Sequence, residues 1–145
     1  MGNTVVRRLK PGDVSEISRI SASITRAQDR TDFKRIVEKQ TQSEDDASFV
    51  AERENKLVGY CITYILSGSF GIEKSAWVAM LGVDPDFMGQ GIGELMATEA
   101  LKDYKARGIN DIYTSVRWDS TDLLSFFKTL GFQRSDFISL HKSLE

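Results

Sequence analysis

Residues 83–93 read VDPDFMGQGIG and join an apolar run to the start of an amphipathic helix. The apolar run, residues 76–83, is typical of a central strand that is covered on both faces. Pro85 prevents that strand from continuing, so the chain must turn here. Apolar residues then recur at helical spacing and predict the longest helix of the protein, which ends before Gly108. This order of strand, loop and helix fixes the centre of the predicted fold.

The glycines of this stretch, Gly89, Gly91 and Gly93, remove side chains from the turn at alternate positions. A ligand can then approach the backbone, where the free N–H groups of the first helical turn point outward. The helix dipole adds roughly half a positive charge at this end. We therefore expect an anion site that holds a pyrophosphate with few basic side chains.

Two common nucleotide motifs do not fit this stretch. A triphosphate-binding loop needs Lys after its last glycine, and Glu94 follows Gly93 here. A dinucleotide fingerprint needs a third glycine, at position 96 if it is counted from Gly91, and this position is Met96. A dinucleotide-binding fold is therefore a weak alternative.

Working outward, hydrophobic spacing and turn residues predict five more strands and three more helices. The strands are expected at residues 4–9, 49–51, 57–66, 112–116 and 137–142. The helices are expected after Asp13, around residues 33–37 with Asp29 or Thr31 as the cap, and from Asp119 or Ser120 to Gly131. Residues 54–56 predict a hairpin turn, and residues 67–74 predict a loop. The predicted class is α/β (α+β), a mixed sheet flanked by helices.

Composition narrows the function further. The 145 residues predict one domain spanning residues 1–145, and no apolar stretch is long enough to cross a membrane. A net charge of −2 argues against a nucleic-acid partner. The single cysteine, Cys61, lies in an apolar run, which favours a core residue in a protein of the reducing cytoplasm.

The chain resembles the GNAT superfamily of N-acyltransferases over nearly all of its length. The signature of that family is Gln or Arg, two residues, Gly, one residue, and Gly or Ala, and residues 88–93 match it except at Met88. Residues 50–59 resemble the central hairpin of the family, and residues 130–132 resemble its closing Gly-Phe turn. The resemblance implies a single-domain mixed sheet splayed between strands four and five, with about four helices and a pantetheine arm in the opening.

The resemblance also implies an acetyl-CoA-dependent N-acetyltransferase that acetylates an amine, on a small molecule or a protein, by direct transfer in a ternary complex. Dimerisation is common in the family, but the sequence does not decide whether this chain forms a homodimer. The backbone N–H that stabilises the oxyanion would lie at or near Val83. The implied cofactor-binding residues are Leu81, Val83, Met88, Gly89, Gln90, Gly91, Ile92, Gly93 and Ser120.

The residues for acid–base chemistry depart from the family pattern. The usual tyrosine acid corresponds to Phe127, and the usual asparagine corresponds to Ser120. A thiol has a pKa of about 8.5, so the departing thiolate does not require an acid near neutral pH. Glu73, at the mouth of strand four, is the nearest candidate base, with Asp119 as a second option. These departures motivate an alternative: a catalytically degenerate module that binds acetyl-CoA or CoA as a sensor or assembly component.

Overall fold

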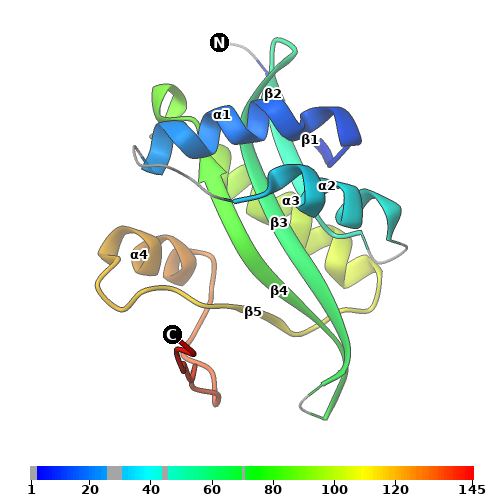
Figure 1. The fold of residues 1–145 in the computed structure, drawn as a ribbon, viewed down its shortest axis with the longest axis vertical. Helices are drawn as coiled ribbons and strands as arrows, with labels where there is room; N and C mark the ends of the chain where they lie inside the picture. Colours follow the sequence, from blue (N-terminus) through cyan, green and yellow to red (C-terminus); the bar gives the residue numbers. More distant parts are fainter. Residues whose placement is uncertain (1–2, 26–30, 44–45, 70) are drawn as a thin grey trace.

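The computed structural model describes residues 3–25, 31–43, 46–69 and 71–145 (Figure 1). Five strands form one sheet in the order β1-β2-β3-β4-β5. Their bounds are β1 Thr4–Arg8, β2 Phe49–Arg53, β3 Lys56–Ser69, β4 Ile72–Val83 and β5 Ile112–Thr114. Strands β1 to β4 pair antiparallel, and β5 pairs parallel with β4. The mixed sheet predicted from the sequence is therefore confirmed.

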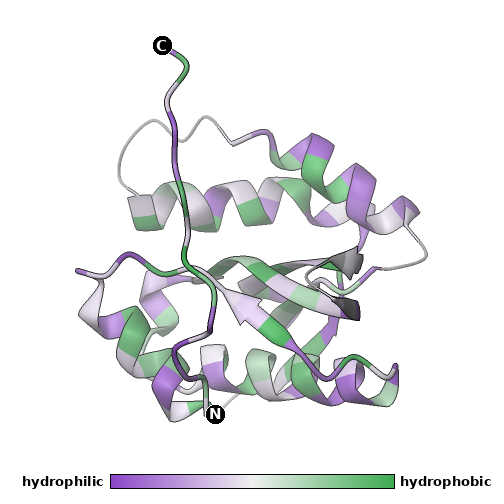
Figure 2. Cartoon of the chain, turned by 90° about the horizontal axis from the view of Figure 1, so that it is seen from below, coloured by the Kyte–Doolittle hydropathy of each residue, from purple (hydrophilic) through white to green (hydrophobic). Residues whose placement is uncertain are grey.

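Helices cover both faces of this sheet (Figure 2). Their bounds are α1 Val14–Thr25, α2 Phe33–Gln42, α3 Ile92–Ala106 and α4 Thr121–Thr129, with short 3-10 turns η1 Pro11–Asp13 and η2 Pro85–Phe87. Ile17 and Val37 bring α1 and α2 onto one face, where they join a buried cluster with Ile62 of β3. Ile92 and Met96 of α3 form a second cluster on the other face. The apolar stripe predicted for the longest helix thus becomes the core on that side.

The hairpin between β2 and β3 confirms the predicted turn. Glu54 and Asn55 have φ angles of 53° and 66°, which are the left-handed values of a two-residue hairpin turn. Lys56 already belongs to β3 and pairs with Arg53. This short connection fixes the position of Arg53 at the end of β2.

The prediction of a loop at residues 67–74 is wrong. Strand β3 continues to Ser69 and β4 begins at Ile72, with Ser67 paired to Lys74. Gly68 and Gly71 both have φ of 74°, so glycine supplies the tight end of a long hairpin and does not terminate pairing earlier. Glycine content alone does not distinguish these outcomes, because hydrogen bonds across the strands can continue through a glycine.

The strand predicted at residues 137–142 does not form. The structure describes all six of these residues, and none of them belongs to a strand. Ile138 and Leu140 are 82% and 86% exposed. A strand requires a partner, and β5 pairs over only three residues with β4. The tail instead touches β5 through the rings of Phe137 and Tyr113, whose centroids are 5.7 Å apart.

Two expected helix caps also differ. The carboxylate of Asp32, rather than the side chain of Thr31, accepts a hydrogen bond from the Arg35 N–H and caps α2. The other expected cap, Asp29, lies outside the described residues. Asp13 precedes α1, and its carboxylate accepts from the Lys10 N–H and from Arg7. Asp13 and Ser120 were predicted before their helices, but Asp32 was missed because the neighbouring Thr31 is also a residue type that caps helices.

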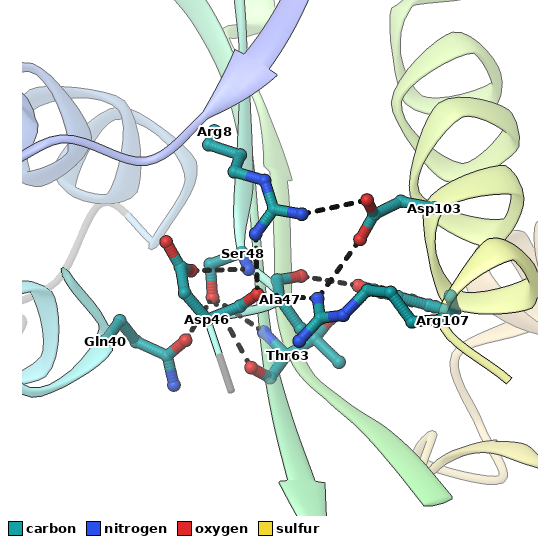
Figure 3. Close-up of polar contacts among 9 residues, drawn as sticks. Arg8, Gln40, Asp46, Ala47, Ser48, Thr63, Asp103 and Arg107 are labelled. Atoms are coloured by element: carbon teal, nitrogen blue, oxygen red, sulfur yellow. Dashed lines mark hydrogen bonds and ion pairs between the residues drawn. The ribbon is translucent and has the colours of Figure 1, made fainter. Parts of the chain in front are cut away.

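A polar network at the C-terminal end of α3 ties the layers together (Figure 3). Arg8 and Arg107 both donate to the carbonyl oxygen of Asp46, and both pair with Asp103. The buried Ser48 hydroxyl donates to Gln40 and accepts from the Thr63 N–H. Every member has a structural partner, so this network anchors the end of α3 opposite the glycine-rich loop.

Candidate functional site

Strand β4 has an open edge where β5 turns away from it. The two strands pair only at Ala76–Val78, while β4 continues to Val83 (Figure 1). Residues 79–83 therefore have no strand partner on the β5 side. This is the splay that the sequence resemblance implied between strands four and five.

A bulge at Ala79 determines which backbone groups face this open edge. Ile62 pairs with Met80 and Thr63 pairs with Val78, so Ala79 is the extra residue. The Asp84 N–H donates to the Val58 carbonyl at 2.8 Å, which fixes the phase of hydrogen bonding beyond the bulge. Alternate residues of an antiparallel strand bond to the same neighbour. The N–H and C=O groups of Leu81 and Val83 consequently point to the open edge.

The glycine-rich loop presents a second set of backbone donors. Gly89 and Gly91 have φ of 79° and 77°, and a Cβ at either position would meet no atom within 4 Å. Among the hydrogen bonds of the described residues, none uses the backbone N–H groups of residues 89–94. Successive free N–H groups at a helix N-terminus form an anion-binding concavity. The residues present therefore fit a diphosphate.

Gly93 has a different role from the other two glycines. A Cβ at Gly93 would lie 3.3 Å from the Phe126 ring and 3.6 Å from Val83. The missing side chain lets α4 pack closely against the first turn of α3. The loop, the end of β4 and α4 are thereby held in one place.

Buried charge holds the chain where β4 meets this loop. The Asp84 side chain is 3% exposed and pairs with Arg19 of α1 at 3.0 Å. Its carboxylate also accepts from the Asp86 N–H in the first turn of η2. Burial by itself raises the pKa of Asp84, but the hydrogen bonds from Arg19 and Asp86 outweigh it, so its pKa is lowered. Asp84 is therefore an ionised anchor.

Arg53 is a site residue that the sequence analysis missed. From the end of β2, its guanidinium donates to the side-chain oxygen of Gln90 in the loop and to the hydroxyl of Thr4. It also lies 5.5 Å from the centroid of the Phe87 ring. No local pattern could have revealed it, because Arg53 and Gln90 are 37 residues apart.

Two candidate residues, Ser120 and Phe127, lie at the start of α4 and within it. Ser120 occupies the N-cap position of α4, although its side chain makes no capping hydrogen bond. Phe127 is 8% exposed and packs edge-on against Phe132. Together with Leu81 it lines a small apolar cavity between β4, α3 and α4. The Phe127 side chain thus lies beside the splay, and its ring has no proton that it could donate.

The two candidate bases, Glu73 and Asp119, are both exposed. Glu73 is exposed near the tip of the β3–β4 hairpin, at the bottom of Figure 1. At about 3.3 Å per residue, it is roughly 33 Å from Val83 along β4. Asp119 pairs with Arg117 on the surface. Trp77 stacks on Tyr113 with centroids 4.6 Å apart, while Trp118 is 87% exposed. Met88, the first residue of the signature, lies at the start of the glycine-rich loop and is 62% exposed.

Cys61 is a core residue, as predicted. It is buried and free, and burial raises the pKa of its thiol to about 11. A thiol with such a pKa stays protonated near neutrality and is a poor nucleophile.

None of the helices in the described ranges is both long and apolar enough to cross a membrane.

The amino-acid sequence is similar to those of known acetyltransferases. The Acetyltransferase (GNAT) family profile matches residues 14–132. A mycothiol acetyltransferase of Amycolatopsis mediterranei is 30% identical over 105 residues, which cover 70% of this chain. That match spans only 35% of the mycothiol acetyltransferase. An acetyltransferase of Pectobacterium atrosepticum is 32% identical over 108 residues, covering 74% of this chain and 72% of the relative.

The fold has solved counterparts as well. An aminoglycoside N-acetyltransferase in complex with CoA superimposes with a TM-score of 0.83 at 12% identity, covering 99% of this chain and 97% of that one. The family match includes β4, the glycine-rich loop, α3 and α4, which are the elements that build the site. The chain therefore belongs to the Acetyltransferase (GNAT) family.

Proposed function

We propose that the protein is an N-acetyltransferase that transfers the acetyl group of acetyl-CoA to an amine in a ternary complex. One observation carries the proposal: the free backbone donors of residues 89–94 lie at the end of the same strand whose open edge offers Leu81 and Val83. An anion at the loop and an extended arm along the edge would be bound together. Acetyl-CoA has a diphosphate and a pantetheine arm in that order.

Each part of the site has a chemical task in this proposal. The N–H groups at the start of α3 hold the diphosphate, and backbone groups of Leu81 and Val83 hold the arm. Bound acetyl-CoA supplies an acetyl thioester. The Val83 N–H would donate to the acetyl oxygen as negative charge develops there. The amine nitrogen bonds to the acetyl carbon, the carbon–sulfur bond breaks, and the amine proton leaves.

Positioning supplies most of the rate in this scheme. Holding two reactants in register can contribute about 7–11 kcal/mol in ideal cases. With Phe127 at the tyrosine position, the sulfur leaves as a thiolate, which is acceptable near neutral pH. Glu73 stays a hypothesis for the base, and its distance from Val83 favours proton loss from the amine to water.

The acceptor is proposed to meet the acetyl group at the open edge of β4. An aminoglycoside-type amine is our first candidate, because the CoA-bound structural neighbour is an aminoglycoside N-acetyltransferase. The net charge of −2 is compatible with a cationic acceptor. We place the protein in the cytoplasm, where the free thiol of Cys61 is stable.

Calorimetric titration with acetyl-CoA, with NADH as the control, tests the cofactor. We expect saturable binding of acetyl-CoA with a Kd on the order of micromolar, and no heat from NADH. Absence of heat from both ligands would mean that the loop is only a turn. Binding of NADH alone would favour a dinucleotide-binding protein.

A thiol-release assay with aminoglycosides and with peptides that have a free N-terminus tests the reaction. Turnover with either class of acceptor supports the enzyme and identifies the acceptor. Tight cofactor binding without acetyl transfer to any member of a broad amine panel would favour the sensor or assembly module.

A further inference from the structure

We propose that Arg53 is a positioning residue that holds the glycine-rich loop ready for the diphosphate, acting through Gln90. The inference rests on the proposed function and goes beyond it, because Arg53 lies on the β2–β3 hairpin, outside the strand–loop–helix segment that forms the site. The carrying observation is the hydrogen bond from the Arg53 guanidinium to the side-chain oxygen of Gln90.

The guanidinium is fixed from three sides. Its Nε and Nη2 donate to the Thr4 hydroxyl at 3.2 and 3.0 Å, while Nη1 donates to Gln90. Its plane lies over Phe87, the last residue of η2, at 5.5 Å from the ring centroid. The two-residue turn at Glu54 and Asn55 holds the backbone beneath it. Arg53 therefore connects β1, the hairpin and η2 to the loop.

The loop needs such a support because of its own composition. Gly89 and Gly91 flank Gln90 and have the largest conformational freedom of any residue type. Ordering them at the moment of binding would subtract from the affinity. Within the described part of the chain, the segment between the two glycines is held by the Gln90 side chain, and Arg53 is its partner. A loop held this way presents its N–H groups before the ligand arrives.

Arg53 also differs from other arginines of the chain in the partners of its guanidinium. Arg7, Arg8, Arg19 and Arg107 each pair with a carboxylate. No carboxylate of the described residues pairs with Arg53. Its guanidinium hydrogen bonds go to the Thr4 hydroxyl and to the Gln90 side chain instead.

The first experiment needs no ligand. Backbone ¹⁵N order parameters of residues 89–91 are measured by NMR in the wild type and in Arg53→Met, Gln90→Leu and Lys56→Met. We expect values of about 0.85 in the wild type, values below about 0.6 in the first two variants, and no change in Lys56→Met. Lys56 is the matched control, because it is the hairpin partner of Arg53 and has the same charge. Unchanged order parameters in Arg53→Met overturn the inference.

The second experiment measures the Kd for acetyl-CoA by calorimetry. Arg53→Met and Gln90→Leu should each weaken binding about tenfold, and the double variant should be no worse than either, because the two side chains act as one unit. Arg53→Lys keeps the charge without the fork, so it should resemble Arg53→Met. Additive losses in the double variant, or full rescue by Lys, would show a direct charge contact and overturn positioning.

The two experiments separate the inference from the proposed function. If the wild type binds no acetyl-CoA, the proposed function fails, whatever the order parameters show. If the wild type binds and Arg53→Met binds equally well, only the positioning role fails. Thermal unfolding of each variant confirms that a lost affinity is not a lost fold.

Discussion

The carboxylate of Asp84, directly after β4, accepts a 3.0 Å hydrogen bond from the Arg19 guanidinium of α1. Arg19 also donates to the Leu57 carbonyl at the start of β3. One side chain thus joins the first helix, the central hairpin and the residue at which the glycine-rich loop begins. The geometry of the site depends on this contact as much as on the glycines.

We expect Asp84→Ala to destabilise the protein by about 1–2 kcal/mol, because it leaves Arg19 and the Asp86 N–H without their acceptor. The side chain of Arg19 is 37% exposed, so solvent screens part of the loss. Urea unfolding measures it. The exposed ion pair of Glu99 and Lys102 provides the control. Exposed pairs contribute about 0–1 kcal/mol, so Glu99→Gln should lower the free energy of unfolding by less than about 0.5 kcal/mol. Equal losses would contradict the role of Asp84.

Acid should destabilise the fold through Asp84 and Asp13. In both, burial raises the pKa but hydrogen bonds from arginine and backbone N–H groups outweigh it, so the folded pKa is lowered. The unfolded chain, with a carboxyl pKa of about 3.9, then takes up protons first as pH falls. The stabilisation is present above this pKa and lost below it. The urea midpoint should therefore fall more steeply between pH 5 and pH 3 in the wild type than in Asp13→Asn or Asp84→Asn; equal slopes would contradict this.

Gly91→Glu should abolish acetyl-CoA binding in a folded protein, because its carboxylate would stand where the diphosphate is expected. Gly108→Glu is a closely matched control: both glycines have positive φ, 77° and 80°, and an added Cβ meets no atom within 4 Å at either. They lie at opposite ends of α3, so the backbone strain is comparable while the site differs. Calorimetry that finds full affinity in Gly91→Glu would refute the placement of the site.

Phe127→Tyr should raise kcat without changing the KM for acetyl-CoA. The ring lies beside Leu81 at the splay, where a phenol could donate a proton to the departing sulfur. Steady-state kinetics with an identified acceptor measures the effect, and a fold check is needed because a hydroxyl enters an apolar region. An unchanged kcat would mean that proton supply does not limit the reaction.

Cys61 should resist thiol reagents in the folded protein. Its burial raises the pKa of the thiol to about 11, so near pH 8 it is both protonated and covered. Labelling with an aromatic disulfide reagent at pH 8 should be slow in buffer and complete in concentrated urea. Rapid labelling of the native protein would show that the sheet opens at β3.

Much of the fold could be predicted from local pattern. The spacing of Ile92, Met96, Ala100 and Tyr104 predicted the buried stripe of α3, and all four are buried. The tight turn at Glu54 and Asn55 followed from residue types that tolerate left-handed backbone. The prediction was wrong at residues 67–74 and 137–142, because strand pairing depends on a distant partner and not on the segment itself.

The sequence by itself determined the turn: a proline that stops β4, glycines at alternate positions and a helix that starts at residue 92 fix where the chain leaves the sheet. Only the tertiary structure decided the rest. The bulge at Ala79 turns the backbone of Leu81 and Val83 toward the open edge, and its effect depends on register with β3. Arg53 reaches Gln90 only because the hairpin ends beside the loop. Local propensity acts over a few residues, whereas register and contact between layers are set by the whole packed chain.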